Sequence, residues 1–570
     1  MRNGLSTLDY LVFLFYILGV SGYGYYIYKR KQTSQLNSQD YFLAEGSLTW
    51  WAIGASMIAS NISAEQFIGA SGAGFSQGLA VAAYEWVAAI ILIFVAVYFM
   101  PIYLRQKIYT MPQFLEQRYN ATLSLIMSIF WLFLYIAVNL TVILYLGALA
   151  INNLVGDVNG NSFHYILVGL AVFALFITLG GMKVVGYTDV IQVGVLLLGG
   201  LATSYLALTL VSEKFGLGSS AIAGFQTLTH AASDHFHMIF EKPTPDSPQA
   251  YVSKYLALPG LVMYTGGQWV ANLNYWGCNQ YITQRALGAD LPTARTGILF
   301  AALLKLIMPL VVVLPGIAAY VLHQQGSLQA EMSAGGAGLN PDNAYSAILT
   351  FLPNGLKGLS LAALTAAIVA SLAGKVNSIS TIFTLDIYRR YLNPSASEAK
   401  LVLVGRITVF VAMLLAIAFT WEDLLGVGGN GGFTFVQKYT GYISPGIVAV
   451  FLLGMFWKRT TATAAIVGVL AGFGFSLFFN DFAASLFGPE TLMYSAFRND
   501  KGIYEVPFLV SMGWSFFLTV ALMAVISLAG PVVNPKALHL DKGMFRVKPS
   551  QLVLITVILL LISALYVKFW

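Results

Sequence analysis

Residues 50–74 read WWAIGASMIASNISAEQFIGASGAG, an apolar stretch long enough to cross a membrane but polar at its centre. A membrane-spanning helix needs about 20 mostly apolar residues. Here the apolar residues are divided by SNISAEQ, which carries Asn61, Ser63, Glu65 and Gln66. The pattern predicts a helix that is interrupted near the middle of the membrane. The alternative is that Gly and Ser only allow close helix packing, but this would not require so many polar side chains in seven residues.

A second stretch has the same character. Residues 261–282 read LVMYTGGQWVANLNYWGCNQYI, with a Gly-Gly pair and with Asn272 and Asn274 at mid-membrane depth. Interrupted helices in corresponding positions of two halves are the best sequence pointer to a transporter binding site. Five spans separate the starts of the two stretches, and an odd offset inverts the second copy in the membrane. Spans 2–6 and 7–11 are therefore predicted to be inverted repeats, although no residue-level repeat is visible.

The composition requires a membrane protein with many spans. Of 570 residues, 58% are hydrophobic and 9% are charged, whereas a soluble domain carries roughly 25% charge. The apolar runs are too long for barrel strands, so they are predicted to be helices with internally paired backbones. Fourteen candidate spans lie near residues 8–28, 49–73, 78–104, 122–153, 163–181, 185–212, 255–282, 297–323, 343–383, 402–421, 431–457, 461–480, 505–530 and 550–569.

The basic residues predict the orientation. With the N-terminus outside, 19 of the 30 Lys and Arg residues are cytoplasmic and eight are external, as the positive-inside rule requires. Fourteen spans then place both termini outside. The net charge of +6 therefore reflects topology rather than nucleic-acid binding. The lone Cys278 excludes an intrachain disulfide, and the six His residues show no metal-ligand spacing on one helix.

Two charged residues lie inside apolar runs. Glu85 is within LAVAAYEWVAAIILIFVAVYFM (79–100), and Lys305 is within GILFAALLKLIMPLVVVLPGIAAYVL (297–322). A charge at the bilayer centre costs about 2.5–3.5 kcal/mol on insertion scales and usually faces a bundle interior or a water-filled cavity. Together they offer an acceptor and a donor for a polar solute. The alternative is a structural ion pair between two helices.

Several motifs resemble the sodium/solute symporter family, in particular its bacterial sodium/galactose branch, which is related to animal sodium/glucose cotransporters. The resemblance extends from about residue 8 to 480 and is carried by SNISAEQFIGASGAG (60–74), AAYEWVAA (82–89), YTDVIQV (187–193), WVANLNYWGCNQYITQR (269–285), AAIVASLAGKVNSISTIFTLDIY (366–388) and VQKYTGYISPGIVAVFLLGMFWKR (436–459).

The resemblance implies an all-α membrane fold with about 14 spans. Its leucine-transporter-like core is a five-plus-five inverted repeat, with one extra N-terminal and three extra C-terminal helices. The implied division is residues 1–48 for the first span and its cytoplasmic loop, 49–212 for repeat 1, 213–254 for an external loop, 255–457 for repeat 2 and 458–570 for accessory helices.

The resemblance also implies a sugar site. A neutral polyol needs side chains that both donate and accept hydrogen bonds, and an aromatic surface for its apolar face. The implied hydrogen-bonding residues are Gln66, Glu85, Asn272, Lys305 and Gln437. Tyr275 would stack on the sugar ring as an inner gate, with Asn61 holding its hydroxyl and Trp276 beside it, while Tyr84 and Phe433 match an outer hydrophobic gate.

This chain departs from the branch at Ala88, where the galactose transporter has a serine that touches the sugar. One polar contact is lost, so the identity of the hexose stays open. A uronate or an amino sugar also stays open, because a charged substituent could pair with Glu85 or Lys305.

Na⁺, the implied co-transported ion, prefers oxygen ligands, which unwound helices supply through carbonyl groups. The implied ligands are the carbonyls of Ala59, Ile62 and Ala367 and the hydroxyl of Ser371. The family usually has a serine pair at the last position, whereas this chain has Ala370-Ser371. We therefore expect weaker Na⁺ binding, or a water molecule in place of the lost hydroxyl.

Asp189 has two interpretations. Family members with a second sodium combine this acid with hydroxyls at positions that are Ala370, Ala373 and Gly374 here. Because those hydroxyls are missing, we expect one Na⁺ per sugar. Asp189 would then attract the cation along its pathway, or be a structural partner of a basic residue near the inner surface. Glu65, one position before the residue that the family uses, is interpreted as structural.

The resulting expectation is a sodium-coupled hexose symporter that works by alternating access in a bacterial inner membrane, with both termini periplasmic. Its expected partners are the sugar, Na⁺ and lipid but no nucleic acid, and the oligomeric state is open. Alternatives are the same mechanism with an inositol, a uronate or an amino acid, or a solute sensor. An enzyme is not expected, because no catalytic grouping or phosphate-binding GK[ST] loop is present.

Overall fold

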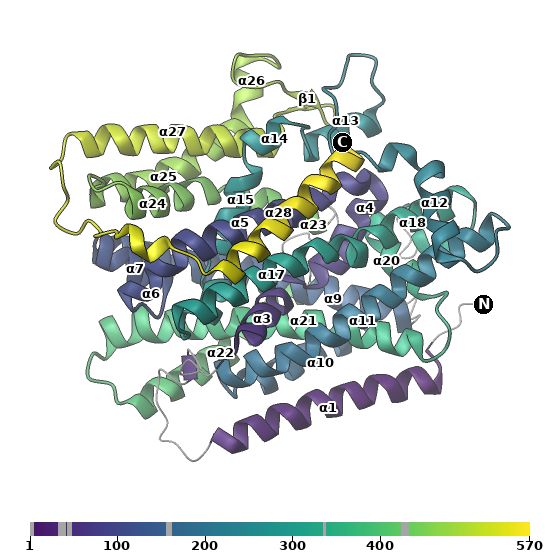
Figure 1. Cartoon of the computed structure of the whole chain (residues 1–570), viewed down its shortest axis with the longest axis horizontal. Helices are drawn as coiled ribbons and strands as arrows, with labels where there is room; N and C mark the ends of the chain where they lie inside the picture. The colour runs from purple at the N-terminus through teal and green to yellow at the C-terminus, as the bar shows by residue number, and fades with distance from the viewer. Residues whose placement is uncertain are drawn as a thin grey trace.

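The computed structural model describes residues 5–31, 41–42, 48–155, 162–333, 338–422, 424 and 432–570. Almost all of this chain is helical (Figure 1). Within the described ranges the regular strands are β1 (Phe497–Arg498) and β2 (Tyr504–Glu505), which pair antiparallel with Phe497 opposite Glu505. The all-α membrane architecture predicted from the sequence is confirmed.

Labels beginning with η mark π-helical or 3₁₀ turns. Up to residue 257 the helical segments are α1 (Thr7–Lys31), α3 (Trp50–Asn61), η2 (Glu65–Ala70), α4 (Ser71–Gln77), η3 (Gly78–Ala82), α5 (Ala83–Phe94), η4 (Val95–Phe99), α6 (Met100–Gln106), α7 (Met111–Arg118), α8 (Ala121–Phe133), η5 (Leu134–Leu140), α9 (Thr141–Val155), α10 (Phe163–Thr178), α11 (Met182–Lys214), α12 (Ala221–Ala231), η6 (Ser233–His235) and α13 (Gln249–Ala257).

The remaining helical segments are α14 (Val262–Thr265), α15 (Gln268–Gly277), α16 (Gln280–Leu287), α17 (Leu291–Val312), α18 (Leu314–Gln324), α19 (Gln329–Met332), η7 (Pro341–Asn343), α20 (Ala344–Leu349), α21 (Leu356–Thr381), η8 (Ile382–Leu392), α22 (Glu398–Trp421), α23 (Gly432–Gly441), α24 (Ser444–Phe456), α25 (Ala462–Leu477), η10 (Phe478–Phe482), α26 (Ala483–Phe487), α27 (Phe508–Leu528), η11 (Lys542–Phe545) and α28 (Pro549–Phe569).

Ten helical stretches in the described ranges are long and apolar enough to cross a membrane, and Phe163–Thr178 and Ser444–Phe456 are shorter apolar helices. All fourteen predicted runs contain helix. The two counts differ because interrupted spans are split into short pieces, and because the helical segments within Glu65–Gln106 follow one another without a non-helical residue, although the chain turns at Gly78 (φ 81°) between the second run and the third.

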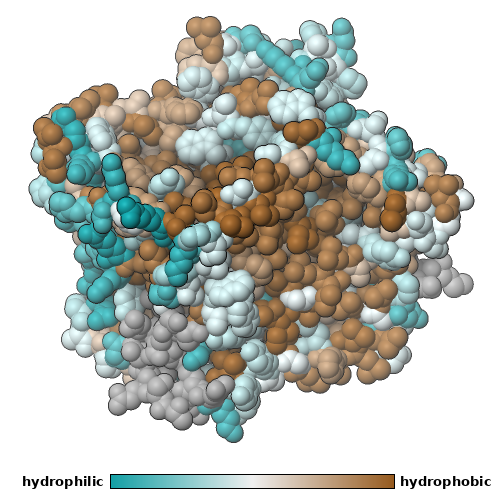
Figure 2. Space-filling view, in the orientation of Figure 1, coloured by the Kyte–Doolittle hydropathy of each residue, from teal (hydrophilic) through white to brown (hydrophobic). Residues whose placement is uncertain are grey.

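The helices divide into a buried centre and a lipid-facing rim. In the stretch Leu356–Leu392, which contains α21, 94% of the 18 consecutive residues with the highest hydropathy are buried. The corresponding share is 17% in Pro549–Phe569 (α28). Figure 2 shows the apolar surface that α28, α17 and α11 present between hydrophilic ends. α21 therefore lies in the bundle interior, and α28 faces the hydrocarbon.

The first predicted interruption is confirmed. α3 ends at Asn61, and Ile62 is extended with φ −81° and ψ 104°. Ser63 organises the restart, since its Oγ accepts from the Glu65 amide at 3.2 Å and its carbonyl accepts from the Gln66 amide at 3.1 Å. The Gln66 amide is thus turned away from the Ile62 carbonyl, which an unbroken helix would have used.

The second interruption divides its span into α14, α15 and α16. Gly266 and Gly267 form the first break, where the Gly267 amide donates to the Leu509 carbonyl of α27 at 2.7 Å. A Cβ on Gly267 would lie 2.6 Å from the Cβ of Met512, and one on Gly266 would lie 2.9 Å from the Leu509 oxygen. The glycine pair therefore allows both the break and the close approach of α27.

Candidate functional site

A polar cavity lies where the two interrupted spans meet. It is lined by Asn61, Glu65, Gln66, Tyr84, Glu85, Ala88, Leu134, Asn139, Ala271, Asn272, Asn274, Tyr275, Trp276, Asn279, Tyr281, Lys305, Lys375, Val436, Gln437, Thr440, Gly441 and Ser444. All six predicted sugar-binding residues are among them. Residues far apart in the sequence meet here because both helix breaks face the same space.

Glu85 and Lys305 form an ion pair across α5 and α17. The Lys305 Nζ lies 2.5 Å from Glu85 Oε2 and also donates to Asn61 Oδ1. The exposed fraction is 4% for Glu85 and 1% for Lys305, so each charge depends on the other for compensation. The structural pair that the sequence left open is therefore present, and both members also line the cavity. The paired charges leave this wall neutral overall.

The amide side chains around the cavity differ in whether they already form hydrogen bonds with other residues. Asn272 Nδ2 donates to the Gln268 carbonyl at 2.9 Å, and Asn274 Nδ2 donates to Ser444 Oγ at 2.9 Å. Gln66 and Gln437 line the cavity without a side-chain hydrogen bond to another described residue. Their amides are free to donate to and accept from a solute.

Aromatic rings bound the cavity on two sides. Tyr275 contacts Trp276 with ring centroids 5.1 Å apart and Tyr281 at 5.6 Å, and Asn61 is within hydrogen-bonding reach of its hydroxyl. On the other side, Tyr84 and Phe433 meet edge to face at 5.1 Å. Phe433 does not itself line the cavity but packs behind Tyr84, which does. This placement is compatible with the two predicted gates, whose movement is a further prediction.

The predicted sodium ligands lie beside the first break. The Ser371 hydroxyl on α21 is completely buried and has no hydrogen-bond partner in the described chain. Among the described residues, no backbone amide at Ser63 or Gln66 donates to the carbonyls of Ala59 or Ile62. Ala367 lies one helical turn before Ser371. Buried oxygens without donors suit a cation, because an unmatched buried acceptor is otherwise costly.

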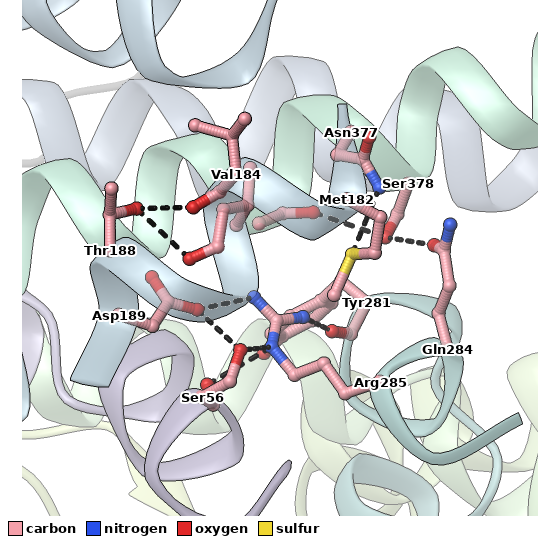
Figure 3. A network of polar contacts seen from close by, with 12 residues as sticks. Ser56, Met182, Val184, Thr188, Asp189, Tyr281, Gln284, Arg285, Asn377 and Ser378 are labelled. Atoms are coloured by element: carbon pink, nitrogen blue, oxygen red, sulfur yellow. Dashed lines mark hydrogen bonds and ion pairs between the residues drawn. The ribbon is translucent and has the colours of Figure 1, made fainter. Parts of the chain in front are cut away.

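Asp189 of α11 is held in a polar network with Ser56 of α3 and Arg285 of α16 (Figure 3). Its Oδ2 accepts from the Ser56 hydroxyl and lies 3.5 Å from Arg285 Nη2. Arg285 Nε also donates to Ser56 Oγ at 2.8 Å, and Nη1 donates to the Tyr281 carbonyl. Of the two interpretations, the basic structural partner is present. A role for Asp189 in the cation pathway stays a prediction.

Sequence reasoning missed three cavity or network residues with clear signals. Lys375 sits inside an apolar run, the same signal that identified Glu85 and Lys305. Arg285 closely follows an apolar run, a position that predicts a cytoplasmic surface charge, yet it is 2% exposed. Asn279, which follows the second break, lines the cavity and accepts from the Tyr135 hydroxyl.

A helical membrane protein with two interrupted spans around a central polar cavity has the architecture of a secondary transporter. A sequence profile of the sodium:solute symporter family matches residues 41–472. The chain is 43% identical over 579 residues to a sodium/glucose cotransporter of Vibrio parahaemolyticus, covering 100% of this chain and 99% of that protein. It is 32% identical to the human sodium/myo-inositol cotransporter 2, covering 83% and 69% of the two chains.

Among solved structures, a Na⁺-coupled sialic acid symporter in a substrate-bound outward-open state is similar, with a TM-score of 0.74 at 22% identity over 93% of this chain and 99% of that one. This likeness shows a shared fold. The chain belongs to the sodium:solute symporter family, and Na⁺ is its co-transported ion.

Proposed function

We propose that the protein imports a neutral hexose together with one Na⁺ per sugar. The observation that carries the proposal is the convergence of Gln66, Glu85, Asn272, Lys305, Gln437 and Tyr275 on one cavity between the broken helices. The 43% identity to a sodium/glucose cotransporter along the whole chain supports the substrate class. We assign the inverted repeats to residues 49–212 and 255–457, and place the protein in a bacterial inner membrane with external termini.

The charge balance of the cavity favours a neutral solute over a uronate or an amino sugar. Glu85 and Lys305 compensate each other at 2.5 Å, so a charged substituent would have to break this pair in order to bind either member. The other two charged side chains in the cavity lining, Glu65 and Lys375, are opposite in sign, so the lining carries no net charge. Sugar hydroxyls can instead hydrogen-bond to both members without separating them. A neutral cyclic polyol such as an inositol satisfies the same argument, and the 32% identity to a myo-inositol cotransporter makes it the second candidate.

In the proposed mechanism, the Ser371 hydroxyl and the carbonyls of Ala59, Ile62 and Ala367 hold Na⁺ between α21 and the end of α3. This joins the two elements and stabilises the break that positions Gln66 and Asn61. Sugar then binds beneath Tyr84 and against Tyr275, and the gates close in turn. Coupling requires that Na⁺ bind the sugar-competent state more tightly than the alternative state.

The test is uptake of labelled galactose, glucose and myo-inositol into proteoliposomes, with an inward Na⁺ gradient or with K⁺ in its place. We expect concentrative, Na⁺-dependent uptake of a hexose, inhibited by the other hexose but not by glucuronate or glucosamine. Gln437→Ala should abolish it while the protein still folds. Uptake of myo-inositol alone would move the substrate to the second candidate, and equal uptake in K⁺ would contradict sodium coupling.

A further inference from the structure

A second buried lysine faces the cavity and has no role in the site described above. Lys375 lies on α21, is 2% exposed and lines the cavity. Its Nζ is 5.0 Å from the centre of the Tyr281 ring. Glu65, on η2, attracts it electrostatically, but the two do not form a contact ion pair of the kind that joins Lys305 to Glu85. Glu65 Oε1 is buried and has no hydrogen-bond partner in the described chain.

The position of Lys375 along α21 places its charge next to two of the proposed sodium ligands. Ala367, Ser371 and Lys375 are spaced by four residues, so they lie along one face of the helix. One turn, about 6 Å along the axis, separates the Ser371 and Lys375 positions. The ammonium group is thus carried by the same helix face as two of the proposed sodium ligands.

The elements that border this face carry several oxygens without donors. A Cβ on Gly374 would lie 2.9 Å from Ser60 Oγ and nearer still to Arg285 Nη2, so α21 touches the end of α3 and the Arg285 guanidinium here. The charge of Arg285 is offset by Asp189, which lies 3.5 Å from the same Nη2. Ser60 Oγ, Ser371 Oγ and Glu65 Oε1 are all buried and have no hydrogen-bond partner in the described ranges. Such oxygens suit a cation. The nearby ammonium opposes a second positive charge, and the Glu65 carboxylate favours one.

We propose that Lys375 is a fixed positive charge that weakens Na⁺ binding at the Ser371 site, and that Glu65 offsets it. This inference rests on the sodium ligands proposed above. Two like charges up to about 10 Å apart, in a protein interior of effective dielectric constant about 20, repel strongly enough to change an affinity by about tenfold or more. Lys375 and Glu65 thereby set the Na⁺ concentration at which the transporter works, without being ligands themselves.

The experiment removes each charge and measures sodium separately from sugar. Lys375→Met keeps a long unbranched side chain and removes the charge, and Glu65→Gln removes its counter-charge. For each variant, the Na⁺ concentration for half-maximal galactose uptake is measured, together with the sugar KM at saturating Na⁺. Thermal stabilisation of the purified protein by Na⁺ without sugar gives a binding readout that does not depend on transport.

We expect Lys375→Met to lower the half-saturating Na⁺ concentration by about tenfold or more, Glu65→Gln to raise it by a similar factor, and the double variant to lie between them. The sugar KM should change less than twofold in Lys375→Met. Gln437→Ala is the matched control, because it should abolish sugar uptake and leave the Na⁺-induced thermal shift unchanged. Lys375→Arg keeps the charge and should keep the wild-type Na⁺ dependence.

An unchanged or raised half-saturating Na⁺ concentration in Lys375→Met overturns the proposal. A raised sugar KM with an unchanged thermal shift also overturns it, since Lys375 would then belong to the sugar site. If Lys375→Met does not fold, Lys375→Gln replaces it under the same criteria. If Na⁺ neither stabilises the wild-type protein nor drives its sugar uptake, the result instead contradicts the proposed sodium site itself.

Discussion

Lys305 and Glu85 are buried among apolar helices, and each compensates the charge of the other. Removing one partner of such a pair leaves the other uncompensated and typically costs about 3–5 kcal/mol. We therefore expect Lys305→Met and Glu85→Gln each to lower the thermal midpoint clearly. The double variant should recover most of this stability, because no charge is then left unpaired.

Sugar uptake separates a binding role for this pair from a purely structural one. If both side chains hydrogen-bond the solute, the double variant folds but does not transport. Recovery of uptake together with stability would show that the pair only holds α5 and α17 together. The measurements are thermal unfolding in detergent and labelled-sugar uptake on the same preparations.

Position 370 offers a gain-of-function test of the cation site. Ser371 supplies the proposed hydroxyl ligand, and Ala370 stands where a second hydroxyl is expected from the family resemblance. A lost or gained polar contact of this kind is worth about 1 kcal/mol, or roughly fivefold in affinity. We expect Ser371→Ala to raise the half-saturating Na⁺ concentration and Ala370→Ser to lower it. Opposite or absent changes would place the cation elsewhere.

Residues of the site could be predicted from the sequence where a polar or charged residue stands within an apolar run. Glu85, Lys305 and the SNISAEQ break stand out against apolar helix, and all of them reach the cavity. Arg285 follows an apolar run and is indistinguishable in sequence from a loop arginine. Its burial depends on Asp189 and Ser56, which lie far away in the chain.

At the level of helices, small residues allow backbones to approach closely. A Cβ on Gly316 of α18 would lie 1.9 Å from the Ser71 carbonyl oxygen of α4, whereas one on Gly194 of α11 would meet no atom within 4 Å. Forcing atoms into a packed interface typically costs about 1–3 kcal/mol. We expect Gly316→Ala to lower the thermal midpoint. Gly194→Ala, the matched control, should be neutral or stabilising by up to about 1 kcal/mol.

Equal effects of the two alanine variants would contradict the close α4–α18 contact. Glycines in these spans have two explanations, which are close packing of helices and a break in a helix. Gly316 is needed for packing, while Gly266 and Gly267 also accommodate a helix break. The sequence alone cannot distinguish them, because the deciding contacts come from distant helices.

The turn η6 fixes the loop before α13 to the bundle through His235. Its ring stacks on Tyr320 with centroids 3.9 Å apart, and Nε2 lies 3.0 Å from the Phe75 carbonyl. Burial, helped by the charge of Lys254, lowers the pKa of His235. The folded state thus favours the neutral ring. The contribution of the buried His235 ring to stability is therefore complete at pH values above the ordinary histidine pKa of about 6.5.

Below that value the unfolded chain takes up a proton more readily than the folded chain, so stability falls as the pH falls toward the lowered pKa of His235. We expect the thermal midpoint of the wild type to drop between pH 7.5 and 5.5 by more than that of His235→Gln. The Gln amide can still donate to Phe75 but does not titrate. Identical drops would show that His235 does not contribute to the pH dependence.

The helical state of the apolar runs was largely predictable, because membrane depth restricts each of them to a helix. All fourteen runs contain helix, and the two breaks lie within the predicted stretches. The number of uninterrupted spans was not predictable from apolar length. Where a helix is broken, as at Ile62 or at Gly78 between α4 and η3, depends on tertiary contacts.

The missing hydroxyls at Ala370, Ala373 and Gly374 lead to a thermodynamic prediction for the complete transporter. One charge crossing 100 mV releases about 2.3 kcal/mol, and a tenfold Na⁺ gradient adds about 1.4 kcal/mol. With one Na⁺ per sugar, the total of about 3.7 kcal/mol supports an accumulation of at most about 500-fold. Two Na⁺ would square this limit to about 2.5 × 10⁵ under the same conditions.

Steady-state sugar accumulation in proteoliposomes, with the voltage clamped by a K⁺ gradient and valinomycin, measures this limit directly. At 100 mV and a tenfold Na⁺ gradient we expect the ratio to stay below about 500, and we expect this limit to rise tenfold for each further tenfold increase in the gradient. A hundredfold rise would require a second Na⁺, and Asp189 would then be its best ligand despite Arg285. In that case Asp189→Asn should restore the tenfold dependence, whereas with a single Na⁺ it leaves the dependence unchanged.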